Sequence, residues 1–480
     1  MVNIRKIIHK VWDSPTFTTW GSFFVKAVSV SLVLSLVLNR FTSSEVALWF
    51  LFSTIFSLQN IIDLGFNPTF SRAIAFARGG ANIDEIKDFR QNRESIREGF
   101  INISTLSGII PTMDRIYKYL SIVLLVVMGI IGTISLQRPI DQTGNENLAW
   151  IAWGIVLFSS FFNLRGNKYS AYLIGMNFIA LVRRWEILFS IGRLITQLSI
   201  LLFDANILSL IIATHVWTIL NVLRNRMLCN KIENGIFKDF ETLKFNKLVF
   251  NSLWSSAWRS GIGMGLGYGI VQTSGIIYAQ FESSKEVASF LLSLKIMETI
   301  VQFSQAPFYS KLPLLATLRS RGDIDQQRTV AKRGMTLSYF SFVAACVFFG
   351  VFSDPLLLII NSDTEFVSLQ FWGLLCLANL FHRYGAMHIQ LYSTTNHIIW
   401  HIADGISGII YIMVSLLLFN LIGIYAFVVG MLCGYLGFYS WYSAKHSYNS
   451  FKLQFWNFDK NAALSFVILL IFTITTISFT

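Results

Sequence analysis

The sequence predicts an all-α polytopic membrane protein with two related bundles of six helices and one extra C-terminal helix. The 480 residues have a mean hydropathy of +0.57, and 54% are apolar but only 13% are charged, which excludes an ordinary soluble domain. A short pattern also recurs after 239 residues, since Pro68-Thr-Phe-Ser-Arg72 returns as Pro307-Phe-Tyr-Ser-Lys311. Each copy ends an apolar stretch that opens with Glu-Val-Ala, at residues 45 and 286. The chain therefore consists of two related halves, as in many transporters.

Apolar runs of about 20 residues predict thirteen membrane-spanning helices, because only helices satisfy the backbone of such segments in lipid. The runs form a set of six, a second set of six and a last one: 20–38, 46–64, 119–136, 148–164, 186–203 and 207–222; 251–278, 286–310, 334–352, 366–382, 398–419 and 423–441; and 461–479. The fourth helix of each set is expected to continue to about residue 174 or 393.

These runs also predict the domain boundaries. We expect an amphipathic N-terminal segment, an N-lobe with a long cytosolic loop, an inter-lobe linker, a C-lobe, and a cytosolic segment with the thirteenth helix: 1–19, 20–222 (loop 65–118), 223–249, 250–441 and 442–480. The middle of the loop, 83–100, has apolar residues at helical spacing among charges and is expected to lie on the inner leaflet as a helix.

Lys and Arg residues set the expected orientation. With the N-terminus in the cytosol, 31 of the 38 lie in cytosolic segments, and only Arg40, Arg138 and Lys285 lie on the other side. The net charge of +12 is thus explained by the positive-inside rule, and no nucleic-acid partner is expected. Since each lobe has an even number of spans, we expect a pseudo-twofold axis along the membrane normal and a cavity between the lobes.

The repeated segments carry a resemblance to a known family. Leu64-Gly-Phe-Asn-Pro-Thr-Phe-Ser-Arg72 with Ala77-Arg-Gly-Gly80, Gln305-Ala-Pro-Phe-Tyr-Ser-Lys-Leu-Pro313 and Tyr172-Leu-Ile-Gly-Met176 resemble oligosaccharide-lipid flippases of the Wzx type. These form the polysaccharide transporter branch of the multidrug/oligosaccharidyl-lipid/polysaccharide exporter superfamily, which includes MATE antiporters and the lipid II flippase. The thirteenth helix departs from the even number usual in that superfamily.

The resemblance implies a V-shaped bundle that works by alternating access in the bacterial inner (cytoplasmic) membrane. Its substrate would be an undecaprenyl-diphosphate-linked oligosaccharide, such as an O-antigen or a similar surface-polysaccharide repeat unit, moved from the cytosolic to the periplasmic leaflet. Membrane lipids would surround the protein, and a polysaccharide polymerase and a chain-length regulator would be its partners.

An anionic lipid diphosphate needs cations in a water-filled cavity, and four lie inside predicted spans: Lys26, Arg193, Arg259 and Lys295. Lys26 and Arg259 lie in the first helix of each lobe, where they either flank one ligand or snorkel to the surface. Arg193 and Lys295 are close to the bilayer centre. Lys295 either meets phosphate or forms an internal ion pair with Glu298, three residues on.

Further cations lie on the cytosolic ends of the fourth helices. Arg165 and Lys168 share one face in the first half, and Arg383 with two histidines (His382 and His388) occupies the matching place in the second. They either form a basic vestibule for the incoming headgroup or mark the membrane boundary.

Acidic residues inside the predicted spans are few. If an ion gradient drives transport, Glu298 is the first candidate for the coupling site and Asp404 the second. Asp63 is a third candidate. Its alternative roles are to cap the end of its helix or to pair with Arg72.

Glycines and prolines mark the expected hinges. Alternating glycines in the seventh span, Gly261, Gly263, Gly265, Gly267 and Gly269, favour a helix that bends, although close packing is the alternative. The prolines of the repeat, Pro68 and Pro307, are included among the conformational positions.

Several function classes find no support in the sequence. The four cysteines show no metal-ligand spacing, and no Walker loop, nucleophilic triad or HExxH motif is present, so we expect no enzyme, no cofactor and no metal. Two alternatives stay open. A cation-coupled multidrug antiporter of the same fold would need a cavity dominated by acids, and a polysaccharide polymerase would need a large periplasmic loop.

Overall fold

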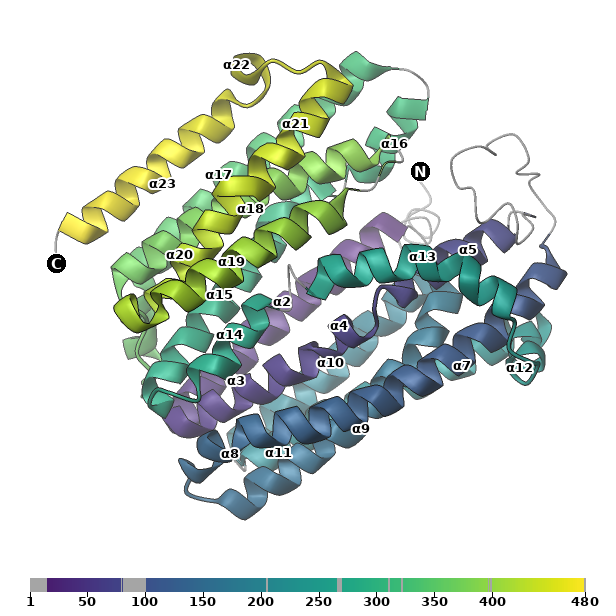
Figure 1. Ribbon diagram of the computed structural model, residues 1–480. Coiled ribbons are helices and arrows are strands. Elements are labelled where there is room, and N and C mark those ends of the chain that lie inside the picture. The colour runs from purple at the N-terminus through teal and green to yellow at the C-terminus, as the bar shows by residue number, and fades with distance from the viewer. Residues whose placement is uncertain are drawn as a thin grey trace, which may run out of the picture. The chain divides into compact units, whose positions relative to one another are not determined.

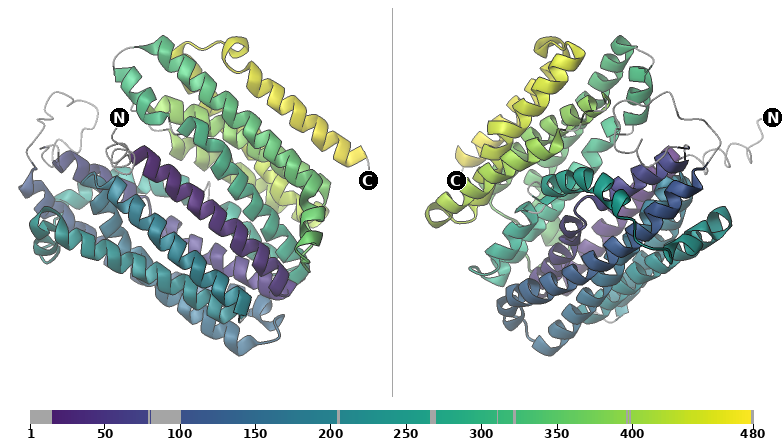
Figure 2. Two further views of the ribbon diagram at one scale, coloured as in Figure 1. Left: turned by 180° about the vertical axis from the view of Figure 1, so that it is seen from behind. Right: turned by 45° about the vertical axis from the view of Figure 1, so that its right-hand side comes forward.

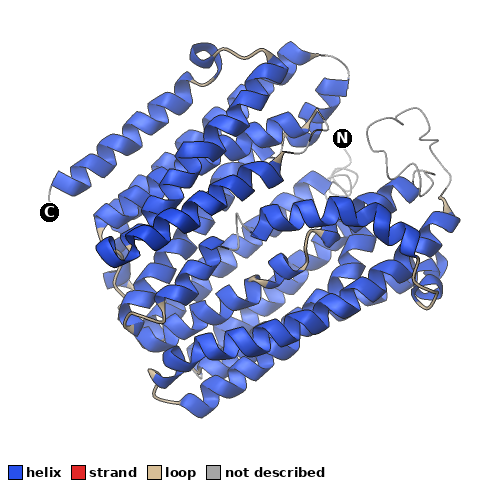
Figure 3. Cartoon of the chain, in the orientation of Figure 1, coloured by secondary structure: helices blue, strands red, loops and turns tan. Residues whose placement is uncertain are grey.

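The computed structural model describes residues 15–78, 80, 101–203, 206–265, 270–309, 311–320, 323–395, 397 and 399–478. This part of the chain is helical and contains no strand (Figure 3). Packing divides the chain into two compact units, Met1–Gly261 and Ile262–Thr480. The predicted all-α class is therefore confirmed.

The first unit is a bundle of long helices (Figure 1). Within it α9 packs against α5, α7 and α11, and α10 packs against α2 and α11. Its elements are α2 (Pro15–Arg40), α3 (Ser43–Ser57), α4 (Gln59–Ile62), α5 (Phe66–Arg78), α7 (Ile103–Val127), η1 (Met128–Gly132), α8 (Thr133–Asp141), α9 (Glu146–Gly175), α10 (Ile179–Phe203), α11 (Ile207–Lys231), η2 (Ile232–Gly235), α12 (Ile236–Glu241) and most of α13 (Lys247–Met264).

The second unit repeats this succession and adds two helices at its end. Its strongest packing joins α19 to α20, α15 to α17, and α18 to α21 and α23. Its elements are α14 (Ile270–Tyr278), α15 (Ser284–Tyr309), α16 (Leu312–Ser320), α17 (Ile324–Ile359), α18 (Leu369–Ser393), α19 (Trp400–Ile422), α20 (Tyr425–Gly434), η4 (Tyr435–Tyr439), α21 (Ser440–Phe451), α22 (Phe455–Phe458) and α23 (Lys460–Ser478). Helix α23 lies along α17 and α18, so the extra helix is an integral part of this unit (Figures 1 and 2).

The repeated Glu-Val-Ala tripeptide is part of a helix cap in both halves. Glu45 accepts a hydrogen bond from the backbone N–H of Thr42 at 3.0 Å, and the Thr42 hydroxyl accepts one from Glu45 N–H at 3.4 Å. In the second half Ser283 and Glu286 exchange the same two bonds, at 3.1 and 3.4 Å. Each pair is a capping box, which satisfies two backbone donors that the first turn of a helix leaves unpaired.

The repeated Pro-aromatic-Ser segment is a point of close helix packing in both halves. A Cβ on Gly175, within the Tyr172–Met176 motif, would lie 2.7 Å from the carbonyl oxygen of Ser71. A Cβ on Gly334 of α17 would lie 3.1 Å from Cα of Phe308. Small residues that let helices approach this closely are a common means of association between membrane helices.

The described helices differ from the expected organisation in two places. The segment 65–118 is not a loop, because α5 and the first half of α7 occupy much of it and bury apolar side chains such as Phe70 and Ile109 in the first unit. The charged residues between these two helices lower the hydropathy of the segment, so the helices were not recognised from the sequence. The seventh helix also does not belong wholly to the C-lobe, because α13 packs in the first unit as far as Gly261. The segments 1–14 and 81–100 lie outside the described residues, so the amphipathic helices predicted there are not tested.

The predicted ends of the fourth helices are correct, since α9 ends at Gly175 and α18 at Ser393. Eight described helical stretches are long and apolar enough to cross a membrane, and they match eight of the predicted spans. The other five predicted spans also contain helices: α2, α13 with α14, α18, α20 and α23. The chain is thus a multi-pass membrane protein.

A substitution at Gly434 tests how closely α19 packs on α20. A Cβ at Gly434 would lie 2.5 Å from the carbonyl oxygen of Ser407, whereas one at Gly437 would meet nothing within 4 Å. We expect Gly434→Ala to destabilise the protein by about 1–3 kcal/mol through overpacking. Gly437→Ala should be neutral or slightly stabilising, because Ala favours helix over Gly. Thermal unfolding of the two purified variants checks this, and equal melting temperatures would contradict it.

Candidate functional site

A cluster of cations surrounds one carboxylate in the first unit. Glu186 of α10 accepts hydrogen bonds from Lys26 Nζ at 2.9 Å, Arg183 Nη1 at 2.8 Å and Ser22 Oγ at 3.0 Å. Lys26 and Ser22 lie one turn apart on α2, which packs along α10. Lys26 therefore does not simply snorkel away from the bundle, because a carboxylate of another helix holds its ammonium.

Two more arginines extend this cluster. The Arg224 guanidinium of α11 lies 5.0 Å from the ring centre of Phe189, which is one turn from Glu186 on α10. Arg224 is buried, and its Nε and Nη1 have no acceptor among the described residues. Arg193 lies two turns beyond Glu186, about 10 Å along α10, and is half-buried. No described side chain forms an ion pair with it.

We name Lys26, Arg183, Glu186, Arg193 and Arg224 the α10 cluster. It contains four cations and one carboxylate, so it has a surplus of positive charge in a bundle of apolar helices. Such an arrangement can bind an anion, and the arginines can bind phosphate oxygens in bidentate fashion. The sequence pointed to Lys26 and Arg193 but missed the other three. Arg183 and Glu186 have the i, i+3 spacing of a helical ion pair, which was the available signal.

The structure does not place Lys168 in an open vestibule. Its side chain is 2% exposed and bonds to Asp114 and, at 2.5 Å, to Glu241. These residues tie α9 to α7 and α12. Arg165 lies at the edge of this group, 3.9 Å from Asp114. The two acids, 54 and 73 residues away in the chain, leave Lys168 no surplus charge.

Arg383 and His388 are also buried, and His382 is half-buried, so these residues do not line an open vestibule. Arg383 Nη2 donates to the Val301 carbonyl at 2.8 Å, and Nη1 donates to Gln305 at 3.3 Å, so the side chain joins α18 to α15. His382 packs on the rings of Tyr435 and Tyr439, and His388 is fully buried. The alternative that these residues mark the membrane boundary is not tested.

Lys295 and Glu298 form the internal ion pair that their spacing allows. The Nζ–Oε2 distance is 2.8 Å, and each side chain is about one-third exposed, at 33% and 32%. Lys295 is therefore neutralised by its neighbour. Arg259 lies on α13, but its side chain is outside the described part of the structure.

The remaining acids differ in their surroundings. Asp63 is buried at the break between α4 and α5, and accepts hydrogen bonds from Asn67 N–H, Tyr117 and Asn167 at 2.9, 2.9 and 3.1 Å. Arg72, one alternative partner, is not among its contacts, and the bond from Asn67 N–H lies in the first turn of α5, the helix that follows Asp63. Asp404 is half-buried in the first turns of α19, and its Oδ2 would lie 3.7 Å from a Cβ on Gly263.

The glycine-rich span is described as two helices, on either side of residues that the structure does not describe. Helix α13 ends at Met264, shortly before Gly265, and α14 begins at Ile270. Gly267 and Gly269 are outside the described residues. Gly261 has a packing role, because a Cβ there would lie 2.7 Å from Cα of Leu64.

The two repeat prolines lie on either side of helix breaks. Pro68 is in the first turn of α5, which a proline tolerates, and Pro307 is in the last turn of α15. Whether the glycines and prolines are hinges stays a prediction.

Solved structures share the arrangement of these helices. An inward-facing multidrug resistance MATE family transporter of the MOP superfamily matches 89% of this chain and 95% of its own, with a TM-score of 0.66 and 12% identity. The chain shares its fold with MOP-superfamily transporters. The lipid II flippase MurJ in an inward closed conformation matches 96% of both chains, with a TM-score of 0.60 and 12% identity.

A third neighbour is a MOP superfamily transporter from Pyrococcus furiosus, whose structure is described as having a binding pocket of reverse polarity that suggests a different function. It covers 93% of this chain and 98% of its own, with a TM-score of 0.58 and 11% identity. No protein-family model matches the sequence, and no curated protein does. The structural likeness therefore establishes the fold, while the substrate must be argued from the residues.

Lys168 and Lys295 offer a comparison of a buried and a part-exposed ion pair. Lys168→Ala leaves two carboxylates beside a buried site, so we expect a loss of about 3–5 kcal/mol in the free energy of unfolding. Lys295→Ala removes a pair of the part-exposed kind and should cost only about 0–1 kcal/mol. Thermal unfolding measures both. A Lys168→Ala protein as stable as Lys295→Ala would contradict the structural role of Lys168.

Proposed function

We propose that this protein is a flippase that carries an undecaprenyl-diphosphate-linked oligosaccharide, such as an O-antigen or similar repeat unit, from the cytosolic to the periplasmic leaflet of the bacterial inner membrane. The observation that carries the proposal is the α10 cluster, with four cations and one carboxylate. A charge inside the membrane is costly, and two cations of this cluster, Lys26 and Arg193, lie within predicted spans, so we infer that they serve a function. A lipid diphosphate is the anion that such a membrane carrier would meet.

The fold neighbours support a transporter and leave two cargo classes open. One class is represented by the lipid II flippase MurJ, and the other by the multidrug resistance MATE transporters. A pocket that binds organic cations needs acids in excess, whereas the α10 cluster has one acid to four bases. This balance favours an anionic cargo. A polysaccharide polymerase lacks support from the fold, because the neighbours are transporters.

In this proposal Glu186 holds Lys26 and Arg183 in place until the diphosphate arrives. Arg193, together with Nε and Nη1 of Arg224, then contributes donors that no described side chain occupies. The N-terminus is cytosolic, as the distribution of Lys and Arg indicates. A polysaccharide polymerase and a chain-length regulator would act on the exported units.

Substitutions of Arg193 and Lys26 test whether the cargo is anionic. Each charged contact to phosphate contributes about 1.5–3 kcal/mol, so Arg193→Gln and Lys26→Gln should each reduce flipping roughly 10- to 150-fold. Lys285→Gln is the control, because Lys285 is exposed and pairs with exposed Glu365. The measurement is the accessibility of lipid-linked repeat units to a periplasmic glycan-modifying enzyme, in spheroplasts that express each variant in place of the wild type.

The outcomes separate the two cargo classes. Accumulation of protected, cytosol-facing units in the Arg193 and Lys26 variants supports the flippase. Normal exposure of the units after deletion of the gene, together with new sensitivity to cationic dyes, would instead establish a drug exporter.

Asp404 is our proposed coupling site for an ion gradient. Glu298 is occupied by Lys295, and the Asp63 carboxylate already accepts three hydrogen bonds. Asp404 lies beside Gly263, close to the end of α13, so a change in its charge acts on the glycine-rich part of that helix. We expect Asp404→Asn to bind cargo normally but to lose stimulation by an imposed proton or sodium gradient in proteoliposomes. Glu298→Gln and Asp63→Asn should keep that stimulation, and the reverse pattern would reject Asp404.

A further inference from the structure

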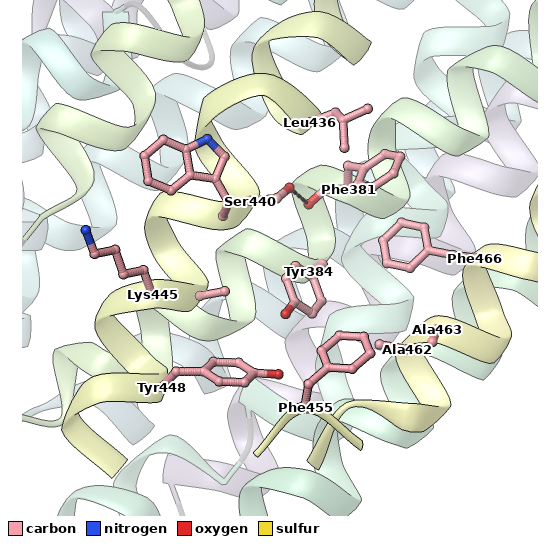
Figure 4. A pocket seen from close by; sticks show the side chains of 12 residues that line it. Phe381, Tyr384, Leu436, Ser440, Lys445, Tyr448, Phe455, Ala462, Ala463 and Phe466 are labelled. Atoms are coloured by element: carbon pink, nitrogen blue, oxygen red, sulfur yellow. Dashed lines mark hydrogen bonds between the residues drawn. The ribbon is translucent and has the colours of Figure 1, made fainter. Parts of the chain in front are cut away.

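A groove of about 590 Å³ opens between the last helices of the second unit (Figure 4). Helix α18 contributes Phe381 and Tyr384, and α23 contributes Phe466 with two small residues, Ala462 and Ala463. The other wall is formed by η4 and α21, from Leu436 to Tyr448, and Phe455 lies beside Tyr448 at one end (Figure 4). The volume lies within the roughly 300–1,000 Å³ of small-molecule sites. The side chains are mostly apolar and aromatic, which suits a hydrocarbon chain.

The end of the groove near Tyr448 is built around a buried polar group. Asp459, at the junction of α22 and α23, accepts a hydrogen bond from the Tyr448 hydroxyl and lies 3.2 Å from His388 Nε2. Both Asp459 and His388 are buried. These contacts hold α21, α18 and the start of α23 together, so the walls of the groove are fixed in advance.

Within the segment 440–463, which forms most of this end, the exposed charges are all positive. Between residues 440 and 463 the charged residues are Lys445, Lys452, Asp459 and Lys460. The three lysines are exposed, while the one acid is buried and bonded to Tyr448. Lys445 lies on the rim of the groove (Figure 4). A ligand here is therefore expected to have an anionic head next to its apolar part.

Exposed aromatic rings accompany the lysines. Trp456 is 75% exposed, and Trp441 and Phe455 are 49% and 41% exposed. Aromatic and basic residues together are typical of the level at which lipid headgroups lie. The groove thus has an apolar body and a basic, aromatic end.

We propose that this groove binds one anionic phospholipid, with an acyl chain between α21 and α23 and the phosphate near Lys445, Lys452 and Lys460. The bound lipid fills the space between α21 and α23, both of which pack on α18. This site lies within the second unit and uses none of the α10 cluster, so it does not depend on the proposed transport function.

The test is lipid retention by the full-length protein. Wild-type protein is reconstituted in vesicles that contain equal amounts of phosphatidylglycerol and phosphatidylcholine. It is then extracted in mild detergent, and native mass spectrometry measures the mass of the protein with any bound lipid. We expect one retained phosphatidylglycerol. The triple variant Lys445→Gln, Lys452→Gln and Lys460→Gln should weaken retention by up to roughly 100-fold. The control triple, Lys238→Gln, Lys244→Gln and Lys247→Gln, removes three exposed lysines of the first unit and should retain the lipid as the wild type does.

A second variant tests the groove itself. Ala463→Trp keeps every charge but fills the space between α21 and α23, so it should also lose the lipid while eluting as a folded protein in size-exclusion chromatography. Equal loss in the control triple, or full retention by Ala463→Trp, would overturn the proposal. Preference for phosphatidylcholine, or for an added polyprenyl phosphate over phosphatidylglycerol, would overturn it too.

Discussion

The cost of holding a charge among apolar helices governs where the polar residues of this chain lie. Lys168 is buried and bonds to two carboxylates, and Asp63 receives three hydrogen bonds at a helix break. Asp459 is paired with His388 and Tyr448. Each arrangement offsets the loss of water around a charge and joins helices that are distant in sequence. Against this background the surplus of cations in the α10 cluster stands out, because no described residue balances it.

The duplication was readable from the sequence because it rests on local rules. A capping box needs only a Thr or Ser and a Glu three residues later, and both halves have it, at Thr42 with Glu45 and at Ser283 with Glu286. The ends of the long fourth helices followed from similar local signals. The close approach of Gly175 to Ser71 explains why two motifs far apart in the chain both carry small residues.

The site was less predictable, since its pairs depend on tertiary packing. Lys26 and Glu186 are 160 residues apart, and nothing local links them. The same holds for Lys168 and Glu241, whose pairing gives a structural role to a cation that was one candidate for a vestibule. Only Lys295 with Glu298, and Arg183 with Glu186, follow from helical spacing. Hydropathy indicates how deep in the membrane a charged residue lies. It does not indicate whether a carboxylate of another helix neutralises that charge.

That distinction assigns different tasks to the two units. In the second unit Lys295 is neutralised by Glu298, whereas Arg383 is buried and donates to the Val301 carbonyl and Gln305, and its Nε has no acceptor among the described residues. In the first unit, no described side chain forms an ion pair with Arg193, and Nε and Nη1 of Arg224 have no acceptor among the described residues. An anionic cargo would therefore gain most of its binding energy from the first unit. A titratable group such as Asp404, beside the glycine-rich end of α13, would then act on the geometry of the helices and not on the affinity for phosphate. Binding and coupling would in this way rest on different residues, which separate substitutions can distinguish.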